Sequence, residues 1–294
     1  MTKDSKNINT PVGETYLASI VRRFKRHKLG MFSFYLFVIL IILALFAPLI
    51  APYDPNEFTP YFGKPPGAEH LLGTDLSGRD VLSRLLFGMR ISLLVGIVVT
   101  IISTSIGVTL GLVSGFFGST IDGILMRFTD MVMSFPYMLL VLMFAAIFEP
   151  GMWTIIIILG FVNWPSVARL VRGNVLSIKE RPFIKRSQVQ GLPGCTILFS
   201  EILPNTIAPI LINATSVMAY SILDEAALSF LGMGVQPPTA SLGNMLGEAK
   251  SLTTLTTKPW LWIPSGLLIV LMVMAINFIG DALRDAMDPT SSRS

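Results

Sequence analysis

Residues 91–117 read ISLLVGIVVTIISTSIGVTLGLVSGFF, a stretch without a single charged side chain. A membrane-spanning helix needs roughly 20 consecutive apolar residues, because lipid offers the backbone no hydrogen-bond partners and the helix must satisfy itself. Five other uncharged stretches have a comparable length. The six predicted spans are residues 31–51, 91–117, 131–148, 151–168, 205–223 and 260–280. The sequence therefore predicts an all-α integral membrane protein with six transmembrane helices.

The composition agrees with a protein that resides in lipid. Of 294 residues, 52% are hydrophobic and only 14% are charged, which leaves too little polar surface to coat a soluble globule. Thirty residues precede the first stretch, and no small-x-small cleavage site follows it, so we expect it to remain as a helix. The net charge of +4 could suggest nucleic acid, but the basic residues follow one membrane face rather than a continuous stripe. We expect no nucleic-acid partner.

The lysines and arginines predict the orientation, because positive charge in short flanking loops stays in the cytosol. With the N-terminus inside, 16 of the 22 basic residues fall on the cytosolic side, so both termini are expected there. Residues 1–30 are then a cytosolic tail, and residues 31–294 form a single transmembrane domain. Its larger loops are outer segments 52–88 and 233–259 and a cytosolic segment 169–204.

A row of small residues marks the second predicted span. Gly107, Gly111 and Gly115 recur at four-residue intervals, so one face of the helix lacks side chains and permits another backbone to approach closely. We interpret this face as a helix-packing surface, with a moving hinge as the alternative.

The cytosolic segment carries its own helix signals. Pro182 and Pro193 suit the first turn of a helix, and Gly191 suits the end of one, which predicts an isolated helix of about two turns. Residues 194–203 then place apolar side chains on one helix face, with Glu201 off it. These apolar residues are Leu198, Phe199, Ile202 and Leu203. Taken alone, such a face is typical of a helix lying on lipid headgroups.

The same segment resembles the cytosolic coupling loop of ABC importer permeases, which reads Glu-Ala-Ala, then Gly, then a hydrophobic-Pro pair. Gly191 and Leu203-Pro204 stand at the family positions, whereas Lys185-Arg186-Ser187 replaces Glu-Ala-Ala. The resemblance implies that this helix docks into a cytosolic ATPase subunit, and the two cations suggest an acidic groove there. The implied contact residues are Pro182, Phe183, Lys185, Arg186, Ser187, Gly191, Leu203 and Pro204.

Three further stretches resemble the peptide/nickel branch of these importers and its shorter, six-span C-type permease. They are residues 70–84, 226–238 and 280–289. The resemblance implies the type I ABC importer permease fold in the plasma membrane of a prokaryote. It also implies a homologous permease as heterodimer partner, two cytosolic ATPases and an external solute-binding protein. The implied substrates are oligopeptides or dipeptides first, and nickel or another small solute second.

The sequence contains no phosphate-binding Gly-x-x-x-x-Gly-Lys-Ser/Thr loop. His27 and His70 are predicted on opposite sides of the membrane, and no metal-binding spacing is present. We therefore expect a non-catalytic subunit that binds no cofactor, with ATP and Mg²⁺ on its partner ATPases.

Polar groups inside or beside the spans are candidates for the substrate pathway, since an unpaired charge in hydrocarbon is costly. We assign this role to Glu225, Asp130 and Asn213, and less strongly to Asp224. Arg127 lies three residues before Asp130 and could pair with it on one helix face. Asn213 could instead join two helices.

Two other transporter classes remain as alternatives. An ion-gradient-driven secondary transporter would normally show inverted repeats, broken helix pairs or acidic residues at mid-membrane, and the sequence shows none of these clearly. A channel would need a carbonyl filter or rings of charge, and no such pattern is found.

Overall fold

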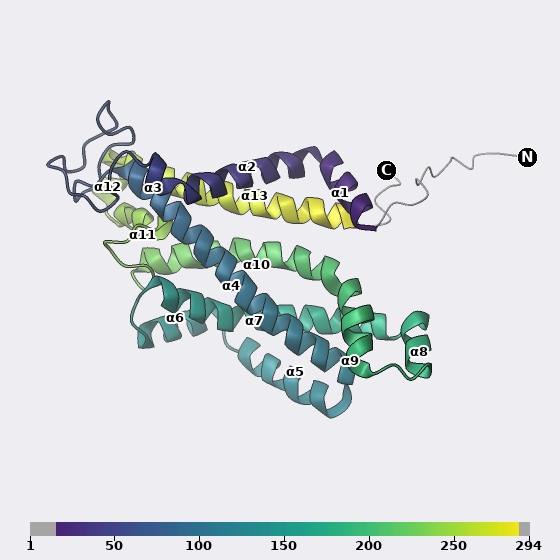
Figure 1. The fold of residues 1–294 in the computed structure, drawn as a ribbon. Coiled ribbons are helices and arrows are strands. Elements are labelled where there is room, and N and C mark those ends of the chain that lie inside the picture. The colour runs from purple at the N-terminus through teal and green to yellow at the C-terminus, as the bar shows by residue number, and fades with distance from the viewer. Residues whose placement is uncertain (1–15, 288–294) are drawn as a thin grey trace, which may run out of the picture.

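The computed structural model describes residues 16–287, and within them the long helices form a single elongated bundle (Figure 1). Five helices are long and apolar enough to cross a membrane. They are α2 (Lys28–Leu45), α4 (Val81–Phe117), α7 (Met152–Lys179), α10 (Leu203–Leu231) and α13 (Ile263–Met287). The predicted all-α membrane architecture is confirmed, and all five lie on predicted spans.

The third predicted span is not one helix. It consists of α5 (Ser119–Met133) and α6 (Tyr137–Ile147), which are bent by 80° where they meet and make a sixth span only if counted together. Pro136 explains the break, because a proline disfavours helical geometry in the residue before it and lacks an N–H to donate. The prediction of a continuous span at 131–148 was wrong, as was the expectation that the chain holds no broken helix pair.

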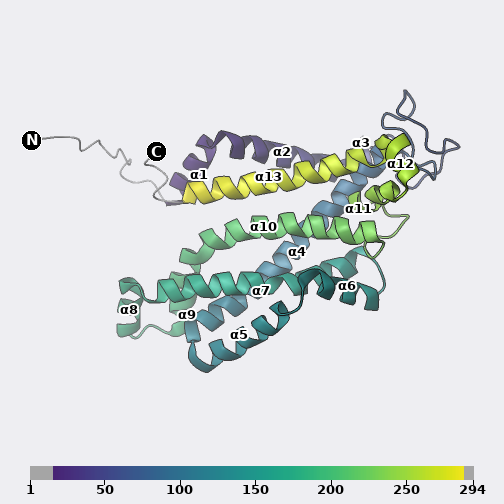
Figure 2. The same cartoon turned by 180° about the vertical axis from the view of Figure 1, so that it is seen from behind.

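The short helices cap the two ends of the bundle. α1, α8 and α9 lie at one end, which we call the α8 end, and α3, α11 and α12 lie at the other, the α12 end (Figures 1 and 2). Their bounds are α1 (Tyr16–Arg26), α3 (Ala47–Ile50), α8 (Pro182–Val189), α9 (Gly194–Ile197), α11 (Leu242–Leu246) and α12 (Leu252–Thr257).

Two helices begin inside segments that were expected to lie outside the membrane. The predicted tail 1–30 contains α1, which packs against α13 and buries Ile20. The predicted outer segment 52–88 contains the first turns of α4, which begins at Val81. Asp80 starts that helix by accepting the backbone N–H of Ser83 at 2.8 Å, the usual role of an N-cap carboxylate.

The glycine row of α4 lies against α7, and these two helices form the most extensive helix contact in the bundle. A Cβ added at Gly107 would lie 2.5 Å from the Cβ of Val167. One at Gly111 would lie 2.6 Å from the carbonyl oxygen of Ala168. Only a residue without a side chain permits such an approach, so the row brings the two backbones together.

The first helix of the broken pair, α5, is joined to α7 by two ion pairs, whereas α6 packs on α7 through apolar side chains. Arg172 forms a bidentate pair with Asp122, both contacts measuring 2.6 Å, and Arg169 pairs with Asp130 at 2.6 Å. The predicted pairing of Arg127 with Asp130 was therefore wrong: the partner of Asp130 comes from α7, 39 residues away.

The other half of the bundle is packed by apolar side chains. α10 lies between α4 and α13, and α2 covers α13 on the far side (Figures 1 and 2). Leu40, Met89, Ile222 and Met272 meet in one buried cluster that joins all four helices. A second buried apolar cluster, which includes Val99, Val141 and Ile155, joins α4, α6 and α7.

Candidate functional site

The α8 end presents the helix that the prolines and glycine predicted. α8 begins with Pro182 and closes on Gly191, whose backbone φ of 74° is the left-handed conformation that glycine adopts readily. The N–H of Gly191 bonds the carbonyl of Gln188 at 3.0 Å, and the N–H of Leu192 bonds that of Ser187 at 3.2 Å. This pair of bonds is a Schellman motif, so the helix ends sharply.

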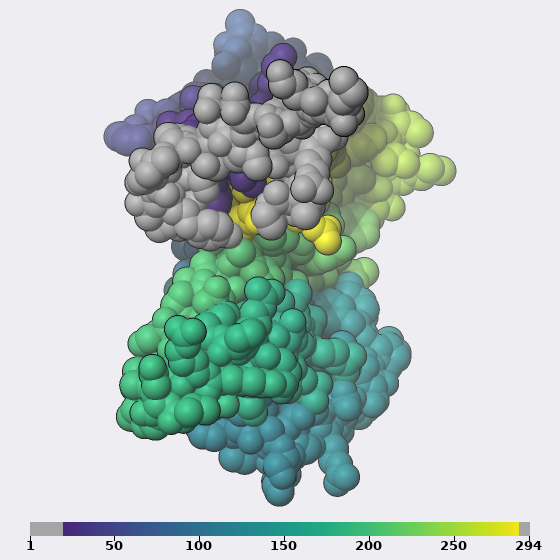
Figure 3. Space-filling view, turned by 90° about the vertical axis from the view of Figure 1, so that its right-hand side faces the viewer, coloured from purple at the N-terminus to yellow at the C-terminus, as the bar shows by residue number. Residues whose placement is uncertain are grey.

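One face of α8 is buried and the other is free. Ile184 is completely buried among α7 and α9, whereas Lys185 and Arg186 are exposed. Val189 is 89% exposed and Phe183 is 40% exposed. In the space-filling view of this end, the surface of α8 and its neighbours is open to the viewer (Figure 3). An exposed mixture of apolar side chains and cations is typical of a surface that a partner protein covers.

Ser187 does not belong to that free surface, although the sequence placed it beside Lys185 and Arg186. It is 7% exposed, and its hydroxyl donates to Glu201 Oε1 at 2.6 Å. Helical spacing explains the difference, because consecutive residues point in different directions. The cations thus face outward, while the hydroxyl ties α8 to the turn that follows α9.

That turn is a short π-helix, Leu198–Ile202, which leads directly into α10. Leu198 and Ile202 are buried, as their spacing predicted, but Phe199 is 61% exposed. Phe199 was wrongly assigned to the apolar face, because the wider π turn rotates it outward. Glu201 Oε2 is buried and accepts no hydrogen bond from the described residues. Leu203 and Pro204 form the first turn of α10.

The Ser187→Ala variant tests the role of this contact. The variant removes the one side-chain hydrogen bond that the described residues make to the Glu201 carboxylate. A buried acceptor without a hydrogen bond lowers the free energy of unfolding by about 1–3 kcal/mol. We expect a lower unfolding temperature for the purified protein and faster proteolysis around α8. The Gln188→Ala variant, at an exposed position one residue on, is the control. Equal proteolysis of the two variants would show that the bond does not hold α8.

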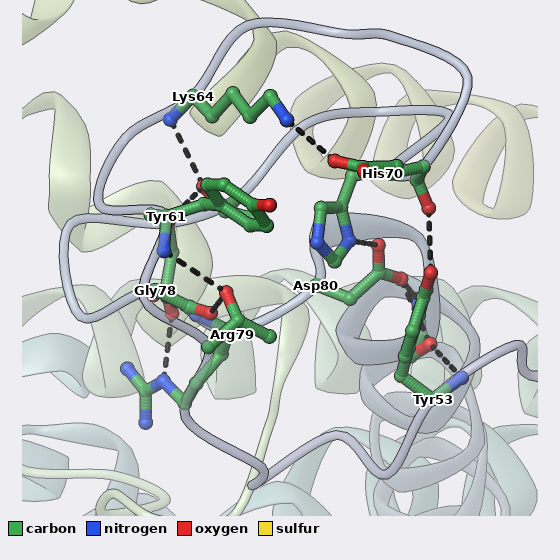
Figure 4. Close-up of polar contacts among 12 residues, drawn as sticks. Tyr53, Tyr61, Lys64, His70, Gly78, Arg79 and Asp80 are labelled. Atoms are coloured by element: carbon green, nitrogen blue, oxygen red, sulfur yellow. Dashed lines mark hydrogen bonds and ion pairs between the residues drawn. The ribbon is translucent and has the colours of Figure 1, made fainter.

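The α12 end carries a long loop, residues 51–80, folded on its own polar contacts (Figure 4). His70 Nδ1 lies 2.9 Å from Asp80 Oδ1, and both side chains are buried. The hydroxyl of Tyr53 donates to the carbonyl of Glu69 at 2.8 Å, and Lys64 pairs with Glu69 at 2.6 Å. These contacts within the loop therefore fix its conformation over the start of α4.

A second charged cluster joins this loop to the segment after α10. Asp75 accepts from Arg79 at 2.7 Å and lies 3.4 Å from Arg84, whose guanidinium also donates to the carbonyl of Pro55 at 3.1 Å. Glu248 faces the same cluster from the other segment. The pKa of Glu248 is raised, mainly by burial and secondly by repulsion from the Asp75 carboxylate. Three cations, Arg79, Arg84 and Lys258, oppose the rise.

The raised pKa predicts a pH dependence of stability. Because Glu248 holds its proton more tightly in the folded state, folding is favoured below the ordinary pKa of 4.5, and this advantage is lost as the pH rises through the folded-state pKa. A neutral amide avoids ionisation, so we expect Glu248→Gln to raise the unfolding temperature at pH 7. On acidification toward pH 4.5, the unfolding temperature of the variant should also rise less than that of wild type.

Glu57→Gln, at an exposed carboxylate of the 51–80 loop, is the control for that experiment and should leave both curves unchanged. A lower unfolding temperature for Glu248→Gln at pH 7 would mean that its attraction to the arginines outweighs the burial.

The candidate pathway residues are not brought together. Glu225 is completely buried, accepting from Ser92 at 2.6 Å and Ser229 at 2.8 Å, so it joins α4 to α10 and faces no open space. Asn213 lies on α10 with its side-chain oxygen buried and without a hydrogen-bond partner in the described chain. Asp130 is exposed and occupied by Arg169. Sequence spacing could not reveal Ser92 or Arg169, since each comes from another helix.

Asp224 has a partner that sequence reasoning missed. Its carboxylate accepts the hydroxyl of Tyr137 at 2.5 Å, which links α10 to the start of α6. The two histidines lie at opposite ends, His70 in the loop and His27 near Asp285 at 3.5 Å. Within residues 16–287 no group of three side chains is placed to hold a metal ion.

Comparison with known proteins gives a consistent result along the chain. Residues 107–293 match the family model of the binding-protein-dependent transport system inner membrane component. Residues 15–66 match the N-terminal transmembrane domain of oligopeptide transport permease C.

Several named proteins are similar over nearly their whole length. A putative peptide permease protein of Brucella suis biovar 1 is 40% identical over 280 residues, covering 95% of this chain and 93% of that protein. A di/tripeptide transport system permease protein of Pseudomonas aeruginosa is 41% identical over 273 residues, covering 90% and 89%. An oligopeptide transport system permease protein of Bacillus subtilis is 38% identical over 269 residues, covering 91% and 87%.

Among solved structures, the inward facing MetNI methionine ABC transporter matches with a TM-score of 0.58 and 18% identity. The match covers 69% of this chain and 96% of that one. This likeness shows the fold, that of a type I ABC importer permease.

Proposed function

Because this chain belongs to the family of binding-protein-dependent transport system inner membrane components, we propose that it is the peptide permease subunit of an ATP-driven importer. The observation that carries the proposal is the near-full-length similarity to permeases named for peptide, di/tripeptide and oligopeptide transport. Nickel is the alternative substrate from the same branch, but none of these three relatives is named for it.

The proposed partners follow from what the chain supplies and what it lacks. It offers a free, cationic helix, α8, for an ATPase subunit, and a rigid loop, residues 51–80, for an external solute-binding protein. A second, homologous permease would complete the pathway as a heterodimer, and ATP and Mg²⁺ would bind to two ATPase subunits.

The orientation proposed here places the α8 end in the cytosol. α1, α8 and the end of α13 lie at that end, so both described termini share it (Figure 1). Arg22, Arg23, Lys25 and Arg26 on α1 add to the cations of α8, which agrees with the positive-inside rule.

The geometry suggests how ATPase motion reaches the spans. α8 is bonded through Ser187 to Glu201, and Glu201 lies in the π-helix that continues into α10. α7 leads into α8 from the other side, since it ends at Lys179. A displacement of α8 would therefore move two spans at once, and α5 would follow α7 through Arg169 and Arg172.

Reconstitution tests this function. The chain is copurified with its partner permease, ATPases and binding protein, placed in lipid vesicles and supplied with a radiolabelled tripeptide or with Ni²⁺. We expect ATP-dependent uptake of the peptide that disappears when the binding protein is left out. Uptake driven by an ion gradient through the chain alone would refute the importer, and uptake of Ni²⁺ instead of peptide would refute the substrate.

A further inference from the structure

Two cavities flank the bend between α5 and α6, and their linings differ in kind. The larger, about 560 Å³, is lined by apolar side chains, among them Phe128, Phe144 and Phe161. The smaller, about 370 Å³, is lined in part by Tyr137, Asn163 and Ser166. Lipid tails suit the first lining but not the second, because polar groups facing hydrocarbon go unsatisfied. The smaller cavity therefore marks a side of the bundle that faces something polar.

This cavity lies well inside the span. Asn163 is about 16 Å along α7 from its start at Met152, near the middle of this 28-residue helix. Tyr137 begins α6 directly after the bend at Pro136, which also lines the cavity. The break in the third span thus opens a polar space at a depth where an unbroken helix would have packed against α7.

The polar groups here are incompletely satisfied. Asp224 accepts one hydrogen bond, from Tyr137 at 2.5 Å, and forms no ion pair with any cation in the described chain. The side-chain nitrogen of Asn163 lies toward the Tyr137 hydroxyl but makes no well-formed hydrogen bond, although it is buried. Within residues 16–287, Asn163 on the cavity wall therefore lacks an acceptor, and Asp224, which reaches the cavity through its bond to the lining residue Tyr137, lacks a cation.

These groups match the parts that all unmodified peptides share. A peptide offers an N-terminal ammonium, which a carboxylate accepts, and backbone carbonyls, which an amide N–H donates to. A pathway that passes peptides of many sequences can recognise only such common groups. The volume falls in the range of small-molecule sites.

We propose that Tyr137, Asn163 and Asp224 form a peptide-binding station within the membrane, in which Asp224 receives the N-terminal ammonium. The inference rests on the proposed peptide import and adds a binding site to it. Tyr137 is a positioning residue, since its hydroxyl orients the carboxylate, and Asn163 donates to a peptide carbonyl. A peptide bound there would supply the missing cation and acceptor.

The test uses the complete complex in lipid vesicles and a tripeptide that carries a diazirine leucine in its second position. In wild type we expect light-induced labelling to map to the segment 137–166. Asp224→Asn should lower both labelling and uptake about tenfold, the size of one lost charge-assisted hydrogen bond, and Asp224→Glu should restore much of both. The N-acetylated probe, which lacks the ammonium, should label wild type and Asp224→Asn equally weakly.

Asp281→Asn is the matched control, because Asp281 is an exposed carboxylate on α13 at the α8 end, and it should leave labelling and uptake unchanged. Equal labelling of wild type and Asp224→Asn would overturn the site. Loss of the partner permease from purified Asp224→Asn would overturn it too. That result would mean that Tyr137, Asn163 and Asp224 contact the other subunit instead of peptide. If wild type itself took up no peptide, the proposed function would fail instead.

Discussion

The Gly111→Val variant is expected to unfold at a much lower temperature than wild type. A Cβ at this position would lie 2.6 Å from the carbonyl oxygen of Ala168 and 2.7 Å from the Cβ of Val171. Both atoms belong to α7 and one is backbone, so neither can turn aside as a flexible side chain would. Overpacking usually costs about 1–3 kcal/mol, and valine adds two further carbons, so we expect about 3 kcal/mol or more. Thermal unfolding of the purified protein in detergent measures it.

Gly173→Ala provides the control on the partner helix. No atom lies within 4 Å of a Cβ at Gly173, and alanine forms helices more readily than glycine by about 1 kcal/mol. The variant should therefore unfold at the wild-type temperature or above it. If Gly111→Val also kept the wild-type temperature, α4 and α7 would not approach each other as closely as the structure shows.

The glycine row illustrates what a sequence can reveal about a membrane fold. A four-residue interval and an uncharged stretch are local properties, and they were sufficient to predict five spans and a bare helix face on α4. The bend after Ser134 was missed, although Pro136 is visible, because an apolar average over 131–148 does not register a change of direction. The polar composition of residues 1–30 does not predict α1, yet this helix packs against α13 and buries Ile20.

In the candidate site, too, the sequence predicted the local backbone features but not the side-chain partners from other elements. Pro182 and Gly191 act on their own backbone, so the sequence predicted the limits of α8 correctly. The partners of its side chains come from elsewhere: Ser187 bonds Glu201, 14 residues on, and Asp130 pairs with an arginine 39 residues away. Helical spacing offers only neighbours on the same helix, which is why Arg127 was preferred for Asp130. Glu225 is bonded by Ser229 on its own helix and by Ser92 on α4, and only the second bond leaves no periodic signal in the sequence.

The exposed cations of α8 lead to the second large effect. With Lys185 and Arg186 both changed to glutamate, we expect peptide uptake and binding-protein-stimulated ATP hydrolysis to fall tenfold or more, while the protein folds normally. Neither side chain is in the core, and the bond of Lys185 to Glu180, 2.7 Å long, lies at the surface, where such pairs contribute little stability. The loss would arise at the ATPase interface, where breaking a close charge pair costs about 2–5 kcal/mol.

Arg284→Glu separates this effect from a general change of charge. Arg284 is an exposed cation at the same end of the bundle, on α13 and not on α8, so its reversal should leave uptake unchanged. A compensating change completes the argument: basic residues introduced into the ATPase groove should restore uptake to the double variant, because opposite charges would again meet across the interface. Unchanged uptake by the double variant would show that α8 docks through Phe183 and Val189 alone, and that the cations standing in place of Glu-Ala-Ala carry no coupling.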